Sequence, residues 1–151
     1  MPSTALDYIT VKGFKSITSI EKLQLRPVNV LIGSNGSGKS NFISVFAFLH
    51  AVREERLRDY VIKAGGAEKL LHFGSKTTKE IEIFLSFKDE VNQYRLILSP
   101  TQDDGLYPST EITFFWDKSR GFTRPWSEAL APREQGREAG ISDPKLTRTP
   151  S

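Results

Sequence analysis

The strongest periodic pattern in the chain is helical and begins at Ser40. Apolar residues follow it at helical spacing, as Phe42, Ile43, Val45, Phe46, Leu49 and Val52. This spacing gathers apolar side chains on one side of a helix. At residues 53–56 the pattern gives way to alternating charges, where we expect a solvated helix face with local ion pairs. The pattern therefore predicts one long amphipathic helix.

Short β-rich runs precede this helix. They cover Tyr8 to Phe14 and Leu23 to Leu25, around a turn at residues 15–17, and then Val28 to Ile32. Their β-branched and aromatic content predicts strands. The last run ends directly at Gly33, so a glycine-rich loop connects a predicted strand to the predicted helix.

Beyond the helix, the period changes to that of strands. Gly65-Gly66 breaks a second helical stretch, and apolar positions then alternate with mostly polar ones from Glu80 to Phe87. Residues 93–98 and 111–116 alternate as well, with turn-rich sequence between them. These segments predict an antiparallel meander, which forms a second β layer beside the sheet that holds the run before Gly33.

Composition favours one domain followed by a polar tail. The chain has 151 residues and 38% hydrophobic content, which is enough for a single core. After Trp126 large apolar residues become rare, and such a segment cannot offset its ordering entropy. We therefore expect residues 1–126 to fold as one unit and residues 127–151 to be disordered or to begin a further segment.

Charge and targeting signals limit the class of protein. The net charge of +3 is too small for a basic nucleic-acid module, and the absence of cysteine excludes disulfides and thiolate metal sites. The two histidines, His50 and His72, are too few for a metal cluster. The N-terminus lacks a secretory layout, and no apolar run approaches the ~20 residues of a membrane span. We expect a soluble, cytoplasmic protein without a membrane partner.

One motif carries chemistry: Gly33-Ser34-Asn35-Gly36-Ser37-Gly38-Lys39-Ser40. Its glycines let the backbone turn sharply, so that successive N–H groups form a nest for phosphate oxygens. The helix that follows adds unpaired N–H groups and the positive end of its dipole. Lys39 would reach the β- and γ-phosphates, and the Ser40 hydroxyl would ligate a magnesium ion that bridges them. The motif predicts a P-loop that binds ATP with magnesium. The alternative, a glycine-rich surface loop with an incidental lysine, does not explain its place between a strand and a helix.

The motif and its surroundings resemble the start of an ABC-like ATPase head of the RecF, SMC and OLD type. The resemblance rests on Gly13-Phe14-Lys15-Ser16-Ile17 and on the stretch from Asn29 to Asn41, while Gly65 to Gly74 is similar to a bacterial group of predicted AAA-family ATPases. It covers residues 8–126. It implies an α/β P-loop NTPase fold, in which this chain is the N-terminal lobe of a head, with a mixed sheet and an antiparallel β-subdomain.

The resemblance also implies roles for individual residues. Asn35 would contact the terminal phosphate or the attacking water, and Asn41 ends the matched stretch at the phosphate site. Lys15 would lie near the nucleotide phosphates, and the alternative is a solvated turn residue. We expect Phe14 in the core rather than as an adenine platform.

Groups for hydrolysis are not evident in the sequence. By the resemblance, cleavage needs an apolar strand ending in Asp-Glu and a signature loop from a partner head. The candidate Ile83 to Glu90 alternates, is interrupted by Lys88, and leads into another strand as a hairpin would. Gln93 and Gln102 could be proposed to sense magnesium, but polar strand or turn surface is the simpler interpretation. We therefore assign no catalytic residue.

An aromatic cluster lies near the end of the predicted meander. It consists of Phe114, Phe115, Trp116, Phe122 and Trp126, beside the cations Lys118, Arg120 and Arg124. Such a cluster could stack bases beside a charged groove. The simpler interpretation is a core, or a surface that a missing half of the head covers.

Three hypotheses of function remain open. The first is an ATP-binding lobe whose hydrolysis is completed by a missing C-terminal lobe or by a partner in a head-to-head homodimer, with DNA or a defence effector implied by the resemblance alone. The second is a truncated product that binds nucleotide without turnover and acts as an interaction module. The third, a small P-loop kinase, would need a lid and an acceptor-side base that the sequence does not offer.

Overall fold

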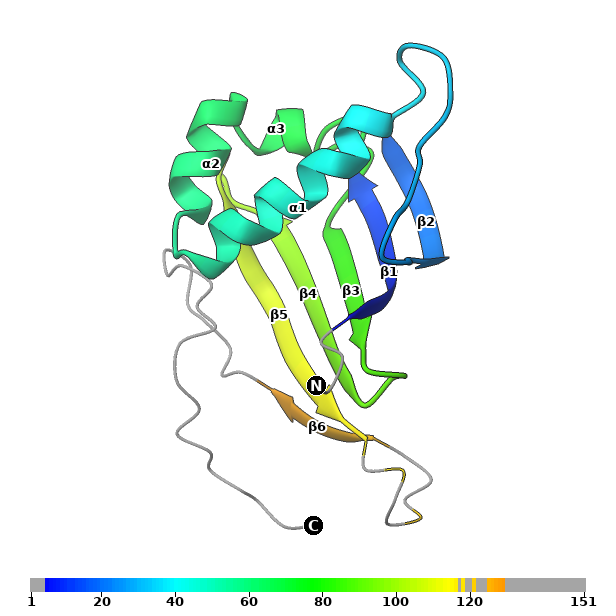
Figure 1. The fold of residues 1–151 in the computed structure, drawn as a ribbon. Coiled ribbons are helices and arrows are strands. Elements are labelled where there is room, and N and C mark those ends of the chain that lie inside the picture. The colour runs from blue at the N-terminus through cyan, green and yellow to red at the C-terminus, as the bar shows by residue number, and fades with distance from the viewer. Residues whose placement is uncertain (1–4, 117, 119–120, 122–124, 130–151) are drawn as a thin grey trace.

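The computed structural model describes residues 5–116, 118, 121 and 125–129, and its main element is one sheet with helices across one face (Figure 1). The strands are β1 (Leu6–Phe14), β2 (Ile17–Gln24), β3 (Ile81–Phe87), β4 (Asn92–Pro100), β5 (Leu106–Phe115) and β6 (Trp126–Ala129). The helices are α1 (Lys39–Arg53), α2 (Leu57–Ala64) and α3 (Ala67–Leu70). The six strands lie in the order β2-β1-β3-β4-β5-β6.

The predicted antiparallel meander is confirmed. Strands β3, β4 and β5 pair in sequence order, and every neighbouring pair of the sheet is antiparallel. Their alternating apolar side chains supply much of the core, with Ile81, Ile83, Leu96 and Leu98 fully buried. Neither the expected mixed sheet nor the expected second β layer is found among the described residues, because every strand there belongs to this one antiparallel sheet.

The run from Val28 to Ile32 is not a strand, which corrects the prediction. Figure 1 shows the chain leaving β2 and returning along the β1–β2 hairpin to α1 as a loop. Val28, Val30 and Ile32 are 80%, 77% and 91% exposed. A strand forms only where neighbouring strands take up its backbone hydrogen bonds, and in the described part of the chain no strand pairs with this run. We call residues 28–38 the P-loop segment.

Helix α1 holds the helical layer onto the sheet. Its buried side chains are Phe42, Val45, Phe48 and Val52. The Phe48 ring lies 5.3 Å from the Phe14 ring of β1 and 5.3 Å from the Tyr60 ring of α2, measured between centroids. Full burial of such side chains contributes about 1.5–3 kcal/mol each. The predicted helix is therefore confirmed.

The apolar pattern of α1 is wider than the face that the sheet covers. Ile43 and Phe46, which were expected on the buried side, are 60% and 40% exposed. Their side chains follow the helical period but lie off the contact with the sheet, so α1 presents a second apolar stripe.

Glycines end the second helix as predicted. Gly65 is the C-cap of α2 with φ 88°, and Gly66 has φ 98° before α3 begins. Asp104 caps α3 from the β4–β5 turn, because its carboxylate accepts a hydrogen bond from the Glu68 N–H at 2.9 Å. The helical layer is thereby tied to the sheet at this end.

Strand β6 pairs with β5 across the predicted domain boundary after Trp126. The partners run from Phe115 with Trp126 to Ile112 with Ala129. Of the predicted tail, residues 127–151, the structure describes only residues 127–129, which belong to β6. The remainder lies outside the described residues, so the expectation of disorder there stays a prediction.

Candidate phosphate site at the start of helix α1

The P-loop closes around the amino group of Lys39. Lys39 Nζ donates hydrogen bonds to the carbonyl oxygens of Gly33 and Ser34, both at 2.6 Å, and to Ser37 Oγ at 3.1 Å. The loop is further closed by a turn in which the Ser37 N–H donates to the Ser34 carbonyl at 3.2 Å. The lysine thus satisfies its donors on the loop itself, at the place where phosphate oxygens would compete for them.

The three motif glycines are needed for different reasons. Gly36 and Gly38 have φ of 83° and 90°, a conformation that costs an L-residue about 1–2 kcal/mol. At Gly33 the reason is space, because an added Cβ would lie 2.7 Å from Ser37 Oγ and 3.8 Å from Lys39 Nζ. A side chain at this position would therefore displace the Ser37 hydroxyl, which accepts a hydrogen bond from Lys39.

The N-terminus of α1 is not capped by a side chain. Its N-cap is Gly38, which makes no side-chain cap hydrogen bond, and the first turn holds no acidic residue. The first N–H groups of a helix lack partners within the helix and carry its positive dipole end. An anion is therefore favoured at this end of α1, next to Lys39.

Lys15 and Asn41 lie beside this end of α1. Lys15 Nζ donates to Ser44 Oγ of α1 at 3.1 Å, and Asn41 Nδ2 donates to Ser16 Oγ at 2.7 Å. Burial lowers the pKa of the Lys15 amino group. The β1–β2 turn is thereby attached to α1, so Lys15 is a helix-bound residue rather than a freely solvated one.

Two further side chains of the motif are exposed and therefore accessible to a ligand. Asn35 lies in the exposed turn of the loop, and Ser40 is exposed in the first turn of α1. Phe14, in contrast, is fully buried, as expected for a core residue.

The Asp89-Glu90 pair lies in the turn of the β3–β4 hairpin, far from the P-loop. Residues Lys88, Asp89 and Glu90 have φ of 54°, 55° and 67° and turn β3 directly into β4. Figure 1 shows this turn at the end of the sheet opposite the loop that leads into α1. The hairpin interpretation is therefore confirmed. Gln93 lies in β4 and donates to the Glu90 carbonyl, while Gln102 lies in the exposed β4–β5 turn.

Some side chains of the aromatic cluster pack against other rings, and others are exposed to solvent. The Phe114 ring lies 6.3 Å from that of Phe84, whereas Phe115 and Trp126 are 52% and 61% exposed. Lys118 Nζ lies 4.7 Å from the centroid of the Trp116 ring. Phe122, Arg120 and Arg124 lie outside the described residues.

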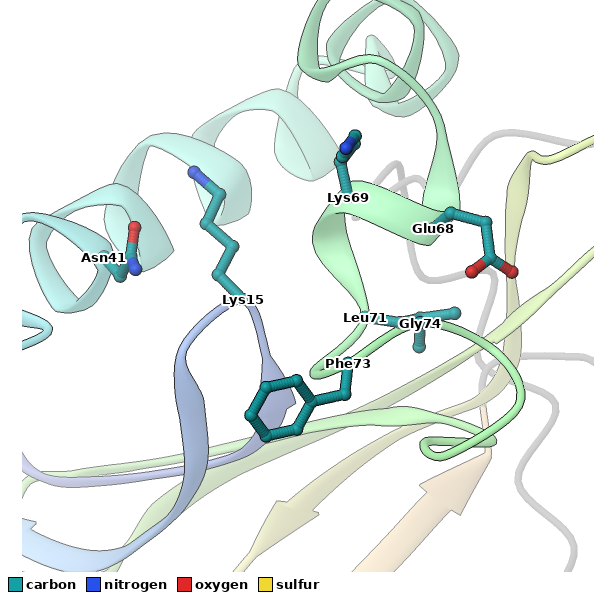
Figure 2. Close-up of a pocket in the computed structure, with 7 residues that line it drawn as sticks. All are labelled: Lys15, Asn41, Glu68, Lys69, Leu71, Phe73 and Gly74. Atoms are coloured by element: carbon teal, nitrogen blue, oxygen red, sulfur yellow. The ribbon is translucent and has the colours of Figure 1, made fainter.

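A pocket that the sequence did not indicate opens beside the phosphate site. It measures ≈ 540 Å³ and is lined by Lys15, Asn41, Glu68, Lys69, Leu71, Phe73 and Gly74 (Figure 2). The loop after α3 is brought here because the Lys15 N–H donates to the Leu70 carbonyl at 2.7 Å and the His72 N–H donates to the Gly13 carbonyl at 3.0 Å. Sequence periodicity does not predict the pairing between β1 and residues 70–72, because this pairing is an isolated bridge and residues 70–72 form no strand.

With this geometry in place, comparison with known proteins gives the family. The chain belongs to the AAA ATPase domain family, whose model matches residues 5–120. This range includes the whole P-loop and the sheet through β5. It agrees with the expected resemblance to AAA-family and SMC-type ATPases.

Two curated relatives match part of the chain. The chromosome partition protein Smc of Thermoplasma acidophilum is 37% identical over 73 residues, which is 44% of this chain and 6% of that protein. Urease accessory protein 2 of Cryptococcus neoformans var. grubii is 35% identical over 83 residues, which is 51% of this chain and 6% of that protein. The match thus spans a small part of each relative's length. No solved structure matches the chain.

Two further observations concern metals and membranes. Within the part of the chain that the structure describes, no three His, Asp or Glu side chains are grouped so that they could hold a metal ion. The described helices include none with the length and hydropathy needed to cross a bilayer.

Proposed function

We propose that this chain binds ATP with magnesium at its P-loop, and that the groups which cleave the γ-phosphate come from further polypeptide. The observation that carries the proposal is the contact of Lys39 Nζ with two loop carbonyls beside an uncapped helix N-terminus. The family assignment supports it, because the matched domain is an ATPase domain that includes this loop.

The site is suited to a triphosphate. Backbone N–H groups of the loop and of the first turn of α1 would hold the phosphate oxygens, and Lys39 would exchange its loop carbonyls for the β- and γ-phosphates. Lys15 would add a second positive charge on the side of the β1–β2 turn.

The residues also fit a magnesium ion. Magnesium in nucleotide sites is usually held by substrate phosphates, water and few protein oxygens. The Ser40 hydroxyl, exposed in the first turn of α1, would be one such ligand. Bound there, the ion would neutralise charge on the β- and γ-phosphates.

Exposed apolar side chains support completion by further polypeptide. Val28, Val30 and Ile32 of the P-loop segment and Ile43 and Phe46 of α1 are all at least 40% exposed. Both sets of residues flank the loop on which ATP would bind. We propose that the C-terminal lobe of the same head covers them, supplies strands that pair with residues 28–32, and allows ATP-dependent association of two heads. Coupling of ATP binding to DNA or to a defence effector remains a prediction from the resemblance.

Calorimetric titration with ATP and magnesium tests the binding site. We expect Lys39→Ala to weaken binding by roughly 10- to 150-fold, the effect of losing a hydrogen bond to a charged group worth about 1.5–3 kcal/mol. Lys63→Ala is the matched control, because Lys63 lies exposed in the last turn of α2 and its loss changes the net charge equally. Equal affinity of Lys39→Ala and the parent would contradict the proposal.

A further inference from the structure

The pocket beside the phosphate site contains an aromatic side chain that the core does not use. Phe73 is 80% exposed although it lies between the buried Leu71 and the buried Gly74. Its φ is 57°, a conformation rare for bulky residues and one that costs of order 1–3 kcal/mol. The fold thus tolerates strain to present a large apolar ring to solvent at the edge of a pocket.

The exposed ring is held in place from behind. The His72 ring lies 4.3 Å from the Phe73 ring between centroids, at 57° to it. His72 is itself fixed, because Nδ1 lies 2.8 Å from the Lys15 carbonyl oxygen and Nε2 lies 2.9 Å from Thr18 Oγ1. Phe73 therefore packs against the His72 ring, which is hydrogen-bonded to the β1–β2 turn and to β2, so less of its orientation remains to be fixed on binding.

A second set of hydrogen bonds fixes the loop that contains Phe73. The Glu68 carboxylate accepts hydrogen bonds from the Ser75 N–H at 3.2 and 3.1 Å and from the Ser75 hydroxyl. Gly74 is required next to it, because an added Cβ would lie 2.3 Å from Glu68 Oε2. Glu68 is thus occupied in holding residues 73–75 and is not a ligand group of the pocket.

The other side chains of the pocket form two chemically different ends, one cationic and one aromatic. Lys15 and Asn41 lie toward α1, where the phosphates would bind, and Phe73 lies on the other side of Lys15, away from α1 (Figure 2). Lys69 of α3 lies across the pocket from Phe73 (Figure 2). The pocket has a volume of ≈ 540 Å³ and is open to solvent on its outer side. A cationic end next to a P-loop and an aromatic end beyond it match the order of a nucleotide, from phosphates to base.

We propose that Phe73 is the stacking platform for the nucleobase of the bound nucleoside triphosphate, and that Lys15 flanks the ribose and α-phosphate between the base and the P-loop. This rests on the proposed function of the P-loop. Stacking on one face of a single ring does not require a particular base edge, so the platform accepts any base.

Paired titrations with ATP and with inorganic tripolyphosphate, both with magnesium, test the platform. Phe73→Ala should bind ATP 5- to 150-fold more weakly than the parent, the range of roughly one lost base–aromatic stack, and should bind tripolyphosphate unchanged. Phe73→Trp should restore ATP affinity and show indole quenching on addition of ATP but not of tripolyphosphate. Phe115→Ala, another exposed phenylalanine at the far end of β5, is the matched control and should bind both like the parent.

The outcomes separate the platform from the P-loop. Equal ATP affinity of Phe73→Ala and the parent would overturn the platform while the P-loop proposal stands. Equal losses of ATP and tripolyphosphate would also overturn it, since the ring would then act on the loop rather than on the base. Binding of neither ligand by the parent would overturn both proposals.

Discussion

In the antiparallel sheet the core side chains of β1, β3 and β4 are fully buried, whereas Val28, Val30 and Ile32 of the P-loop segment are at least 77% exposed. The sheet obtains its order from long-range pairing and from the helices across it. The P-loop segment obtains its geometry from local contacts, chiefly those of Lys39 with the loop. The P-loop can therefore be shaped by its own glycines and lysine while the apolar residues that lead into it remain exposed.

The largest expected difference concerns truncation of large apolar side chains. Phe48→Ala should lower the free energy of unfolding by about 3–5 kcal/mol, because Phe48 is fully buried between Phe14 and Tyr60. Ile32→Ala should change it by less than about 0.5 kcal/mol, since Ile32 is 91% exposed. Urea unfolding followed by circular dichroism measures both. A large loss from Ile32→Ala would show that the P-loop segment is packed in solution, like the sheet.

Glycine replacement gives a smaller contrast. In Gly13→Ala the added Cβ would lie 2.5 Å from the Glu80 carbonyl oxygen at φ 73°, so we expect a loss of at least about 2 kcal/mol in unfolding free energy. Gly36 has φ 83°, but no described atom lies within 4 Å of its added Cβ, so Gly36→Ala should cost about 1 kcal/mol. The same urea experiment compares them, and equal losses would mean that the P-loop is as constrained as the sheet.

The smallest expected effect is a pH dependence in the loop beside the sheet. Hydrogen bonds from the Ser75 side chain and N–H lower the pKa of Glu68 below its ordinary value. The contribution of this carboxylate to loop order is therefore fully present above its unfolded-state pKa, and it is lost as the pH falls through the folded-state pKa. Nuclear magnetic resonance should show the Ser75 amide losing exchange protection in that acidic range.

The P-loop segment should not share this response, because residues 28–38 hold no Asp, Glu or His. Glu68→Gln is the control for the loop after α3, and its Ser75 amide should not respond to pH in the same range. A response that persists in Glu68→Gln would assign the effect to another group.

Much of the fold can be predicted from the spacing of apolar residues along the chain, because the residues that recur at helical or strand spacing are mostly those that pack in the core. The side chains of Phe42, Val45 and Val52 are buried as their spacing predicts, and β3 to β5 follow the alternation. In β3, however, the buried position near the end is Ser86 rather than Leu85, beside a shift in the register with β1. Which face a residue takes after such a shift depends on the neighbouring strand, and a single sequence does not contain that information.

The candidate site likewise has parts that the sequence predicts and parts that it does not. The P-loop is evident in the sequence because its glycines, lysine and serine are contiguous. The β-rich run before it was wrongly expected to be a strand, since β propensity expresses itself only where neighbouring strands are present. Phe73 was not recognised, because an isolated phenylalanine after a short helix has no sequence signature. Its place becomes evident only when hydrogen bonds from His72 to Gly13 and Lys15 attach its loop to the β1–β2 turn.

We propose that this chain holds ATP without the groups that cleave it. Measuring ATP binding and steady-state ATP hydrolysis on the same sample tests this most directly. We predict saturable binding with magnesium that Lys39→Ala weakens, together with phosphate release no faster than from ATP in buffer. Robust turnover that Lys39→Ala abolishes would contradict the account, because a complete hydrolytic site would then lie within these residues.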